Sequence, residues 1–543
     1  MNFILKLSSW LDRTVLELGR EMRLSYLPPL MVYVAAGVSG LTGIVGTFFV
    51  KEYLGLSAEF LAALAFWAGI PWALKMPLGH LVDLIWRYKS VLVFVGAALI
   101  TASLLIMIGL LSHTEAMRQI MSIEAWFVTS ALLAPFGYVV QDVVADAMTI
   151  EAVPKYDHTG QAYNKETIRL MHTTMQTLGR VAIISGTIGV ALLNIYMFSG
   201  VTALDATLKA RIYTDIYQLA LIIPAISVAG VCLGGYLKWR KVNRLHQQGH
   251  TLRTAWGMIN TQDEKPDPNW WILGGSLVFG LFTLSAGLSN IPYNQEIIFI
   301  GSLSIILFLM SRLVKEINAD ARRTIVGTAI IIFIYRAMPT PGAGSTWWMI
   351  DELGFDQQFL SVLSLIAGSL TLVGILVFRR FMAEKSIAYI VVFLTIASTA
   401  LALPIMGMFY GLHEWTAAVT GGIVDARFIA VADTALESPL GQIAMIPMLA
   451  WIANSAPPKL KATFFAVFAS FTNLALSASQ LGTKYINQIF TISREIKDPV
   501  SGVITTPADY SELGILLITV TLLVFSLPLI AVVVVRKTNL QSA

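Results

Sequence analysis

Two pairs of acidic residues stand four positions apart within long apolar runs. The first pair is Asp142 and Asp146, and the second is Asp433 and Glu437. Residues four apart share one face of a helix, so each pair brings two like charges together. One carboxyl group must then keep its proton, or a cation must lie nearby. The available chemistry is proton binding, ion pairing, or contact with a charged solute.

Two arginines in similar surroundings could complement these acids. Arg180 and Arg336 carry guanidinium groups that can hold a carboxylate through two parallel hydrogen bonds. Either arginine could therefore bind an anionic solute. Alternatively, Arg180 neutralises the acids at 142 and 146, and Arg336 extends its long side chain to the surface.

The composition decides what kind of chain surrounds these residues. Of 543 residues, 56% are hydrophobic and 13% are charged, and the mean hydropathy is +0.71. Soluble domains carry roughly 25% charged residues, so a soluble enzyme, a nucleic-acid-binding protein and a disordered chain are excluded. One cysteine, Cys232, gives neither a disulfide nor a cysteine cluster for a metal. We expect no metal, no cofactor and no nucleic-acid partner.

The elements that carry the charged residues are membrane-spanning helices. A helix needs about 20 apolar residues to cross the hydrocarbon core of a bilayer. The chain contains about 14 such segments by that measure, so we predict an all-α polytopic membrane protein. The predicted spans are 27–50, 58–79, 90–112, 125–148, 168–197, 214–236, 271–290, 295–314, 323–340, 357–378, 386–410, 425–455, 461–487 and 512–535.

The distribution of lysine and arginine predicts the orientation. Segments on the side of the N-terminus hold roughly four times as many of these residues as segments on the opposite side. We therefore place both termini in the cytoplasm, and we expect a bacterial inner membrane. Residues 1–26 form a leader, and its sequence is equally compatible with an amphipathic helix on the membrane surface and with a polar extension. Residues 237–270 form a cytoplasmic linker.

An internal repeat indicates how the spans are grouped. Residues 48–61 resemble residues 347–360, and 142–147 resemble 433–438 at a similar separation along the chain. Two related six-helix bundles follow, at 27–236 and 315–538, with an inserted two-helix hairpin at 271–314. Under this repeat, the helix with Asp433 corresponds to the helix with Asp142.

A charged loop after the second span carries candidate gating residues. They are Gly79, Asp83, Arg87 and Lys89, and their spacing resembles the signature loop of the major facilitator superfamily. In that loop the glycine lets a helix end pack closely, and the aspartate caps or pairs so that the two halves close. A charged turn that only anchors a helix end is the alternative.

Lys75 faces the same cytoplasmic layer as this loop. The sequence is equally compatible with two roles for Lys75, an anchor at the membrane interface and a contact for a solute. If Asp146 pairs with Lys75 or Arg87, the pair would lock the cytoplasmic side, and we favour this role for Asp146. For Asp142 we leave open the choice between that lock and the binding of a solute or proton.

The resemblance sharpens to the folate–biopterin transporter family of the same superfamily. It rests on segments in both bundles, namely 68–79, 141–147, 336–341, 352–355, 422–425 and 441–480. The leader and the inserted hairpin lie outside the resemblance, and Lys459 and Lys461 depart from the family pattern. The superfamily plan places a substrate site at the midplane between the halves. It implies that the helices carrying Asp142, Arg336 and Asp433 line that site.

The resemblance implies a secondary active transporter that works by alternating access. The expected solute is pterin-like or folate-like, or a related charged planar metabolite, and the titratable groups make a proton the candidate coupling ion. No phosphate-binding loop for ATP is present in the sequence. The alternative is a non-transporting assembly or pigment-delivery factor on the same fold, with 271–314 as its docking surface. A membrane-embedded enzyme is less favoured, because no nucleophile or metal-ligand constellation stands out.

Overall fold

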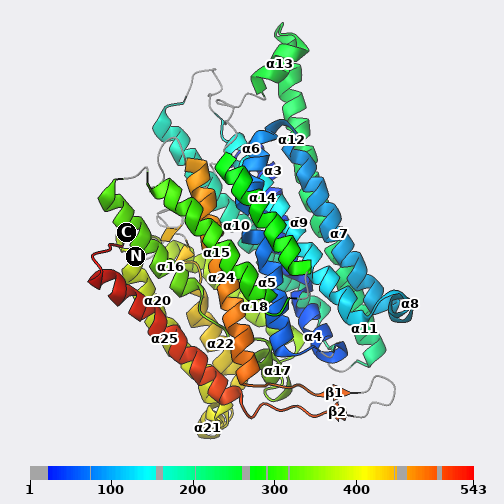
Figure 1. The fold of residues 1–543 in the computed structure, drawn as a ribbon. Coiled ribbons are helices and arrows are strands. Elements are labelled where there is room, and N and C mark those ends of the chain that lie inside the picture. The colour runs from blue at the N-terminus through cyan, green and yellow to red at the C-terminus, as the bar shows by residue number, and fades with distance from the viewer. Residues whose placement is uncertain are drawn as a thin grey trace, which may run out of the picture.

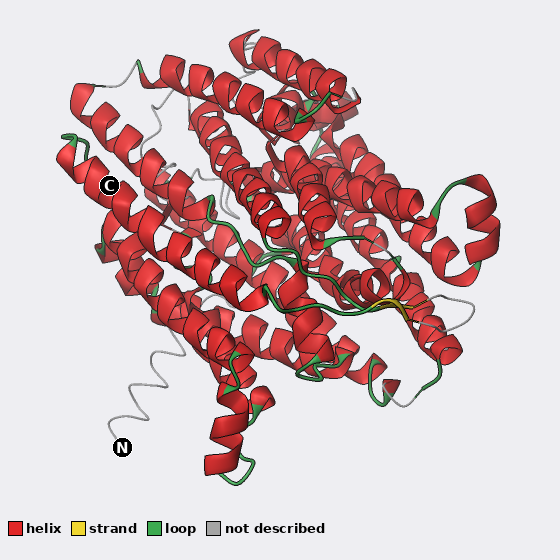
Figure 2. Ribbon diagram, turned by 60° about the horizontal axis from the view of Figure 1, so that its bottom comes forward, coloured by secondary structure: helices red, strands yellow, loops and turns green. Residues whose placement is uncertain are grey.

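A computed structural model provides the fold. It describes residues 22–54, 56–73, 75–154, 163–201, 204–259, 270–288, 291–315, 318–445, 447–448, 461–497 and 504–542. Residues 1–21 of the predicted leader, residues 260–269 of the linker and Lys459 lie outside the described residues. The chain is almost entirely helical, with one short antiparallel ribbon of two strands (Figures 1 and 2).

The first bundle and the linker contain eleven α-helices among the described residues. They are α3 (Leu27–Val38), α4 (Gly43–Tyr53), α5 (Ala58–Ala73), α6 (Lys75–Leu84), α7 (Lys89–Ser112), α8 (Thr114–Ile120), α9 (Ile123–Ala152), α10 (Lys165–Met197), α11 (Ala206–Ala220), α12 (Ile222–Gln247) and α13 (Leu252–Ile259). Short 3-10 turns are η2 (Leu24–Tyr26), η3 (Ser39–Thr42) and η4 (Trp86–Tyr88).

The hairpin and the second bundle follow. They comprise α14 (Trp270–Leu288), α15 (Asn294–Val314), α16 (Ala319–Arg336), α17 (Ala343–Asp351), α18 (Gln357–Val377), α19 (Arg379–Glu384), α20 (Ile387–Phe409), α21 (Leu412–Val419), α22 (Ala426–Glu437), the turn η6 (Ser438–Leu440), α24 (Lys461–Ile489), β1 (Ile496–Lys497), β2 (Ile504–Thr506) and α25 (Leu513–Lys537). We call the end that carries α13 the linker end and the end that carries β1 and β2 the strand end (Figure 1).

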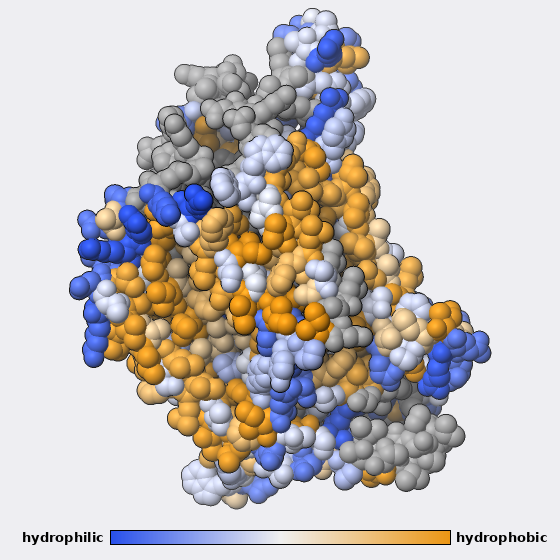
Figure 3. Space-filling model, in the orientation of Figure 1, coloured by the Kyte–Doolittle hydropathy of each residue, from blue (hydrophilic) through white to orange (hydrophobic). Residues whose placement is uncertain are grey.

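The helices are suited to a bilayer. Ten helical segments in the described part of the chain are long and apolar enough to span one. The other predicted spans coincide with α14, α16, α22 and α24. On the face shown in Figure 3, apolar side chains cover most of the middle, and the larger hydrophilic groups lie towards the margins. The predicted all-α membrane fold is confirmed.

Three predicted spans are not the continuous helices we expected. The first span divides into α3 and α4 around η3, and the ninth ends at Arg336 before α17 begins at Ala343. In the ninth, Pro339 and Pro341 supply no backbone donor. The twelfth span ends as an α-helix at Glu437, because Pro439 and Gly441 follow at once.

The linker also begins later than we expected. The helix α12 continues past the predicted span to Gln247, with Arg244 and His246 in its last turn. Cations in that position interact favourably with the negative end of the helix dipole, which supports the extension.

The two bundles meet along two matching interfaces. At one, α5 and α6 pack against α24, and at the other α18 packs against α10. The repeat makes α18 the counterpart of α5 and α6, and α24 the counterpart of α10, so the interfaces are equivalent. The hairpin packs through α15 on α24 and through α14 on α6, so it covers one of these interfaces. The grouping into two bundles and a hairpin stays a prediction.

Candidate functional site

The acidic pair on α9 surrounds a lysine from α6. The Lys75 ammonium nitrogen lies 2.6 Å from Asp142 Oδ2 and 2.8 Å from Asp146 Oδ2. The Tyr33 hydroxyl of α3 donates to Asp146 Oδ1 at 2.7 Å. Only 22% of the Lys75 side chain is exposed. The like charges four residues apart therefore have a shared cation between them, and that cation contacts both acids rather than one.

Arg180 adds a second positive charge near this cluster. It lies on α10, close enough to Asp142 and Tyr33 to act on them electrostatically. Within the described residues, no hydrogen bond or ion pair of its guanidinium group is found. Lys75 and Arg180 thus supply two cationic side chains beside the two acidic side chains of Asp142 and Asp146, so the cluster holds as many basic as acidic groups.

The second predicted span carries Lys75 beside α9. Lys75 is the first residue of α6, and α6 packs against α9. Pro71 lies inside α5, where it withdraws a backbone donor from the preceding turn. From the other bundle, Asn473 of α24 donates to the Trp72 carbonyl oxygen at 3.1 Å. This hydrogen bond ties the two bundles together close to Lys75.

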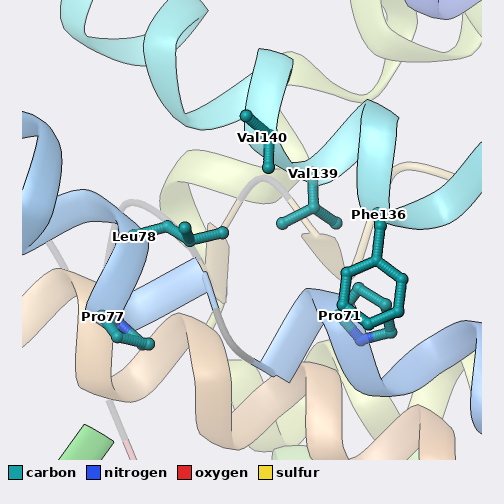
Figure 4. Close-up of a pocket in the computed structure, with 6 residues that line it drawn as sticks. All are labelled: Pro71, Pro77, Leu78, Phe136, Val139 and Val140. Atoms are coloured by element: carbon teal, nitrogen blue, oxygen red, sulfur yellow. The ribbon is translucent and has the colours of Figure 1, made fainter. Parts of the chain in front are cut away.

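A small cavity lies between the same elements and α9. It measures about 170 Å³ and is lined by Pro71, Pro77, Leu78, Phe136, Val139 and Val140 (Figure 4). All of these side chains are apolar and none belongs to the charged cluster. The cavity therefore offers no hydrogen bond to a charged solute, and we do not assign the substrate to it.

The acidic pair on α22 has different surroundings. Asp433 is buried, with 7% of its surface exposed, whereas Glu437 is exposed. Asp433 Oδ1 has no hydrogen-bond partner among the described residues. Glu437 acts on Asp433 electrostatically, and it is a like charge. The second pair has no counterpart of Lys75 in the part of the chain that the structure describes.

Arg336 ends α16 and stays inside the protein. Its Nη1 approaches the Met448 sulfur at 4.0 Å, and its Nε has no hydrogen-bond partner in the described chain. It makes no described ion pair with Asp433. The predicted convergence of Arg336 with the acids of α22 is thus not a direct contact. The Arg336 side chain is partly exposed.

The interruptions in the first and ninth spans are held in the same way. Asn194 of α10 donates to the Leu41 carbonyl oxygen at 3.5 Å, and Asn487 of α24 donates to the Pro341 carbonyl oxygen at 3.2 Å. Both asparagines are buried, and α10 and α24 are equivalent in the repeat. Discontinuous helices near the middle of a bundle are a common way to build a transporter site.

At the linker end, the predicted gating residues have partners within the first bundle. Lys89 is buried and pairs with Glu151 Oε2 at 3.0 Å, and Lys238 pairs with Glu151 Oε1 at 2.6 Å. The Lys89 ammonium group also lies 3.6 Å from the centre of the Trp86 ring. Burial raises the pKa of Glu151, but the two lysines outweigh it and hold that pKa below its usual range.

The other members of this loop contribute less. Arg87 is exposed and stacks on Tyr88. A Cβ atom on Gly79 would meet no described atom within 4 Å, so close packing does not require a glycine there. Asp83 belongs to α6, and its side chain lies outside the described part. The two ion pairs of Glu151 join α9 to α7 and to α12, which all belong to the first bundle.

The strand end is closed by contacts between the bundles. Lys51 of α4 pairs with Asp351 Oδ1 of α17 at 2.5 Å, and the Tyr510 hydroxyl donates to Asp351 Oδ2. Arg494, which follows α24, donates to the carbonyl oxygens of Val50 and Lys51. Its buried guanidinium lies 5.4 Å from the Trp347 ring centre.

The residues of this closure were not predicted as a gate. Lys51 and Asp351 lie in the two repeated segments, and that coincidence is the signal that could have found them. Arg494 and Glu151 had no such signal, because their partners are far away in sequence.

Comparisons with known proteins identify the chain. The sequence model of the BT1 family matches residues 36–541. The protein belongs to the BT1 family. A folate-biopterin transporter from Synechocystis sp. is 22% identical over 462 residues, which cover 84% of this chain and 74% of the relative. Folate transporter 2 of Plasmodium falciparum is 24% identical over 197 residues, covering 36% of this chain and 41% of the relative.

Solved structures with the same fold are transporters of the major facilitator type. The peptide transporter POT aligns with a TM-score of 0.57 at 14% identity, covering 95% of this chain and 94% of the other. The nucleoside transporter NupG aligns with a TM-score of 0.52 at 13% identity, covering 95% of this chain and all of the other. This BT1-family protein is therefore an integral membrane transporter of a small molecule, and not an enzyme.

The hairpin of this BT1-family protein is attached to both bundles by adjacent residues. Gln295 donates to the Ala63 carbonyl oxygen of α5 at 3.2 Å. Glu296 pairs with Lys484 of α24 at 2.9 Å and accepts from Tyr485 at 2.6 Å. Glu296, the acid of the hairpin, thus has structural partners on the second bundle.

Two adjacent aromatic residues of α17 pack inside the protein. Trp347 and Trp348 are buried in the core at the strand end, together with residues of α22 and α25. Trp347 lies under Arg494, and Trp348 contacts Phe409.

Proposed function

We propose that this transporter carries a pterin-like or folate-like solute, or a related charged planar metabolite, between its two bundles by alternating access. Relatives named as folate and biopterin transporters support this choice of solute. The proposed binding region includes Asp433 and Arg336 in the second bundle, with Asp142 and Arg180 facing them from the first.

The observation that carries the proposal is the pair of charges in the second bundle, the buried Asp433 and the partly exposed Arg336, which have no ion-pair partner among the described residues. A charge in the middle of a bilayer costs roughly 2.5–3.5 kcal/mol on insertion scales. Asp433 and Arg336 each retain an atom without a hydrogen-bond partner among the described residues. A solute that carries both hydrogen-bond donors and an anionic group would satisfy both residues and offset that cost.

The closed strand end supports an alternating cycle. We place both termini in the cytoplasm, so the strand end faces the outside of a bacterial inner membrane. In this conformation Lys51, Asp351 and Arg494 close the outer side. Outward opening must then separate Lys51 from Asp351, while Lys89 and Glu151 stay together within one bundle.

A proton is the candidate coupling ion, and the α9 cluster is its candidate site. Lys75 holds both Asp142 and Asp146. A proton on either carboxyl group would weaken one of these ion pairs and free Lys75 to move with α6. We propose this role for Asp146 first, because its side chain is more exposed than that of Asp142.

The alternative of a non-transporting assembly factor is not favoured. The family and the fold are those of transporters, and the hairpin proposed as its docking surface is attached to α5 and α24.

The test is uptake by purified protein in proteoliposomes. Biopterin and folate are supplied as labelled solutes, with a dipeptide and a nucleoside as matched controls. We expect saturable uptake of at least one pterin-containing solute, and its loss in Asp142→Asn, Arg336→Gln and Asp433→Asn variants that remain folded. Equal uptake by the wild-type protein and these variants would contradict the proposed site, and uptake of the controls alone would contradict the proposed solute.

A further inference from the structure

Asp433 lies on the inward face of α22. Ala426, Ile429 and Ala430 precede it at helical spacing and pack in the core cluster at the strand end. Residues spaced by three, four and seven share one helix face. Asp433 continues that face by one turn, and it is as buried as the three apolar residues. The carboxylate is therefore directed into the protein rather than towards lipid.

This carboxylate lacks a partner for a specific reason. Its counterpart Asp142 pairs with Lys75 of α6. In the repeat, the position that corresponds to Lys75 is Gly374 of α18. A Cβ atom there would lie 2.2 Å from the Pro439 carbonyl oxygen, so the backbone of η6 occupies the space. No lysine can reach Asp433 from this position, and the described residues supply no other donor to Oδ1.

The chemistry of the vacant acceptor restricts what can bind. A carboxylate accepts two parallel N–H bonds from a planar group, as it does from a guanidinium. Glu437 adds negative charge nearby, so an anionic group is repelled and donors are favoured. A pterin ring carries such a donor edge, because its 2-amino group and the adjacent N3–H point the same way.

We propose that Asp433 binds the 2-amino and N3–H edge of the pterin ring and so distinguishes pterins from rings with a carbonyl in place of the amino group. This inference rests on the proposed function. It adds the residue that selects the ring, whereas the proposed function requires only that some pterin-containing solute is carried.

The test compares two ligands that differ at one position of the ring. Pterin carries the 2-amino group, and lumazine carries a carbonyl there. Binding of each is measured by calorimetry with the full-length protein in lipid nanodiscs. We expect the wild-type protein to prefer pterin by about tenfold or more, since lumazine leaves one buried acceptor unpaired.

Two variants complete the experiment. Asp433→Asn offers one donor and one acceptor, which match the lumazine edge, so the preference should fall to about threefold or less or reverse. Glu414→Gln removes the same charge from an exposed position on α21, outside the proposed binding region, and it should keep the wild-type preference. Thermal unfolding of both variants checks that they are folded.

Each remaining result overturns the inference in a distinguishable way. A wild-type preference that persists in Asp433→Asn assigns ring selection to another residue. Equal binding of both ligands by the wild-type protein keeps the proposed function and overturns the selection. A changed pH dependence of uptake in Asp433→Asn with an unchanged preference makes Asp433 a proton site instead. Binding of neither ligand by the wild-type protein overturns the proposed function as well.

Discussion

The acidic pair of α9 and the acidic pair of α22 share their spacing and their place in the repeat, but their surroundings are opposite. Asp142 and Asp146 enclose Lys75 and receive a hydrogen bond from Tyr33. Asp433 is buried without such a cation, and Glu437 is exposed. The repeat therefore places an acid at the corresponding position of each bundle. Whether that acid has a cation beside it depends on the neighbouring helices.

The difference separates two tasks within one transporter. In the first bundle the charges satisfy one another, so that site is complete without a solute. In the second bundle Asp433 and Arg336 remain without an ion-pair partner among the described residues, so that site is complete only when something binds. Loss of Lys75 should accordingly reduce stability, whereas loss of the Asp433 charge should reduce transport with little effect on stability.

The largest expected effect comes from removing Lys75. Lys75→Met leaves two buried carboxylates without their cation, and loss of one partner from a buried pair costs about 3–5 kcal/mol. We expect the free energy of unfolding, measured by denaturant titration in detergent micelles, to fall by that amount. The matched variant with Asp142→Asn and Asp146→Asn added should recover most of the loss. An unchanged stability of Lys75→Met would remove the distinction between the bundles.

Removal of the Tyr33 hydroxyl should have a smaller effect of the same kind. Tyr33→Phe deletes one hydrogen bond to a charged acceptor, which is worth about 1.5–3 kcal/mol. The same denaturant titration measures it. Tyr335→Phe in the second bundle is the control, because the described structure gives that hydroxyl no hydrogen bond to an acid, and its stability should change by less than about 0.5 kcal/mol.

Asp433 provides the converse measurement. Asp433→Asn leaves no described cation without a partner. The free energy of unfolding of this variant should therefore stay within about 1 kcal/mol of the wild-type value or rise. Solute uptake in proteoliposomes should nevertheless fall by about tenfold or more. A strong loss of stability with normal uptake would show that the acid of α22 has a structural partner like that of α9.

A pH-dependent effect should appear at the linker end of α9, where the described part of α22 has no equivalent. Because Lys89 and Lys238 hold the pKa of Glu151 below its usual range, Glu151 stabilises the folded state above its unfolded-state pKa. That contribution is lost as the pH falls through the lower folded-state pKa. Glu151→Gln should therefore lose stability at neutral pH and show a flatter dependence below about pH 4.5. A pH profile identical to that of the wild type would exclude this pairing.

The sequence could predict most of the fold, because long apolar runs and charged segments are local properties. Each predicted span coincides with helix in the described structure. The interruption after Arg336 was also readable from Pro339, Pro341 and Gly342, since Gly342 has a positive φ of 80°. The interruption at η3 has no proline, and it depends on Asn194 from a distant helix.

The site was predictable in its charges but less so in their partners. Lys75 was one of two cations considered for Asp146, yet only the folded arrangement shows that it contacts both acids. Glu151 and Arg494 were not identified, because their partners come from helices or loops whose proximity no local pattern reveals. The roles of Asp142, Arg180, Arg336, Asp433 and Glu437 in solute binding stay predictions.

The paired asparagines carry a consequence for the origin of the molecule. Asn194 and Asn487 occupy equivalent helices, and each ties down the same interruption in the first helix of its own bundle. In both bundles the amide holds an interrupted helix by donating to a backbone carbonyl of that interruption. Common descent of the two bundles would account for this shared anchor, whereas Lys75 of one bundle and Gly374 of the other mark where the two copies differ.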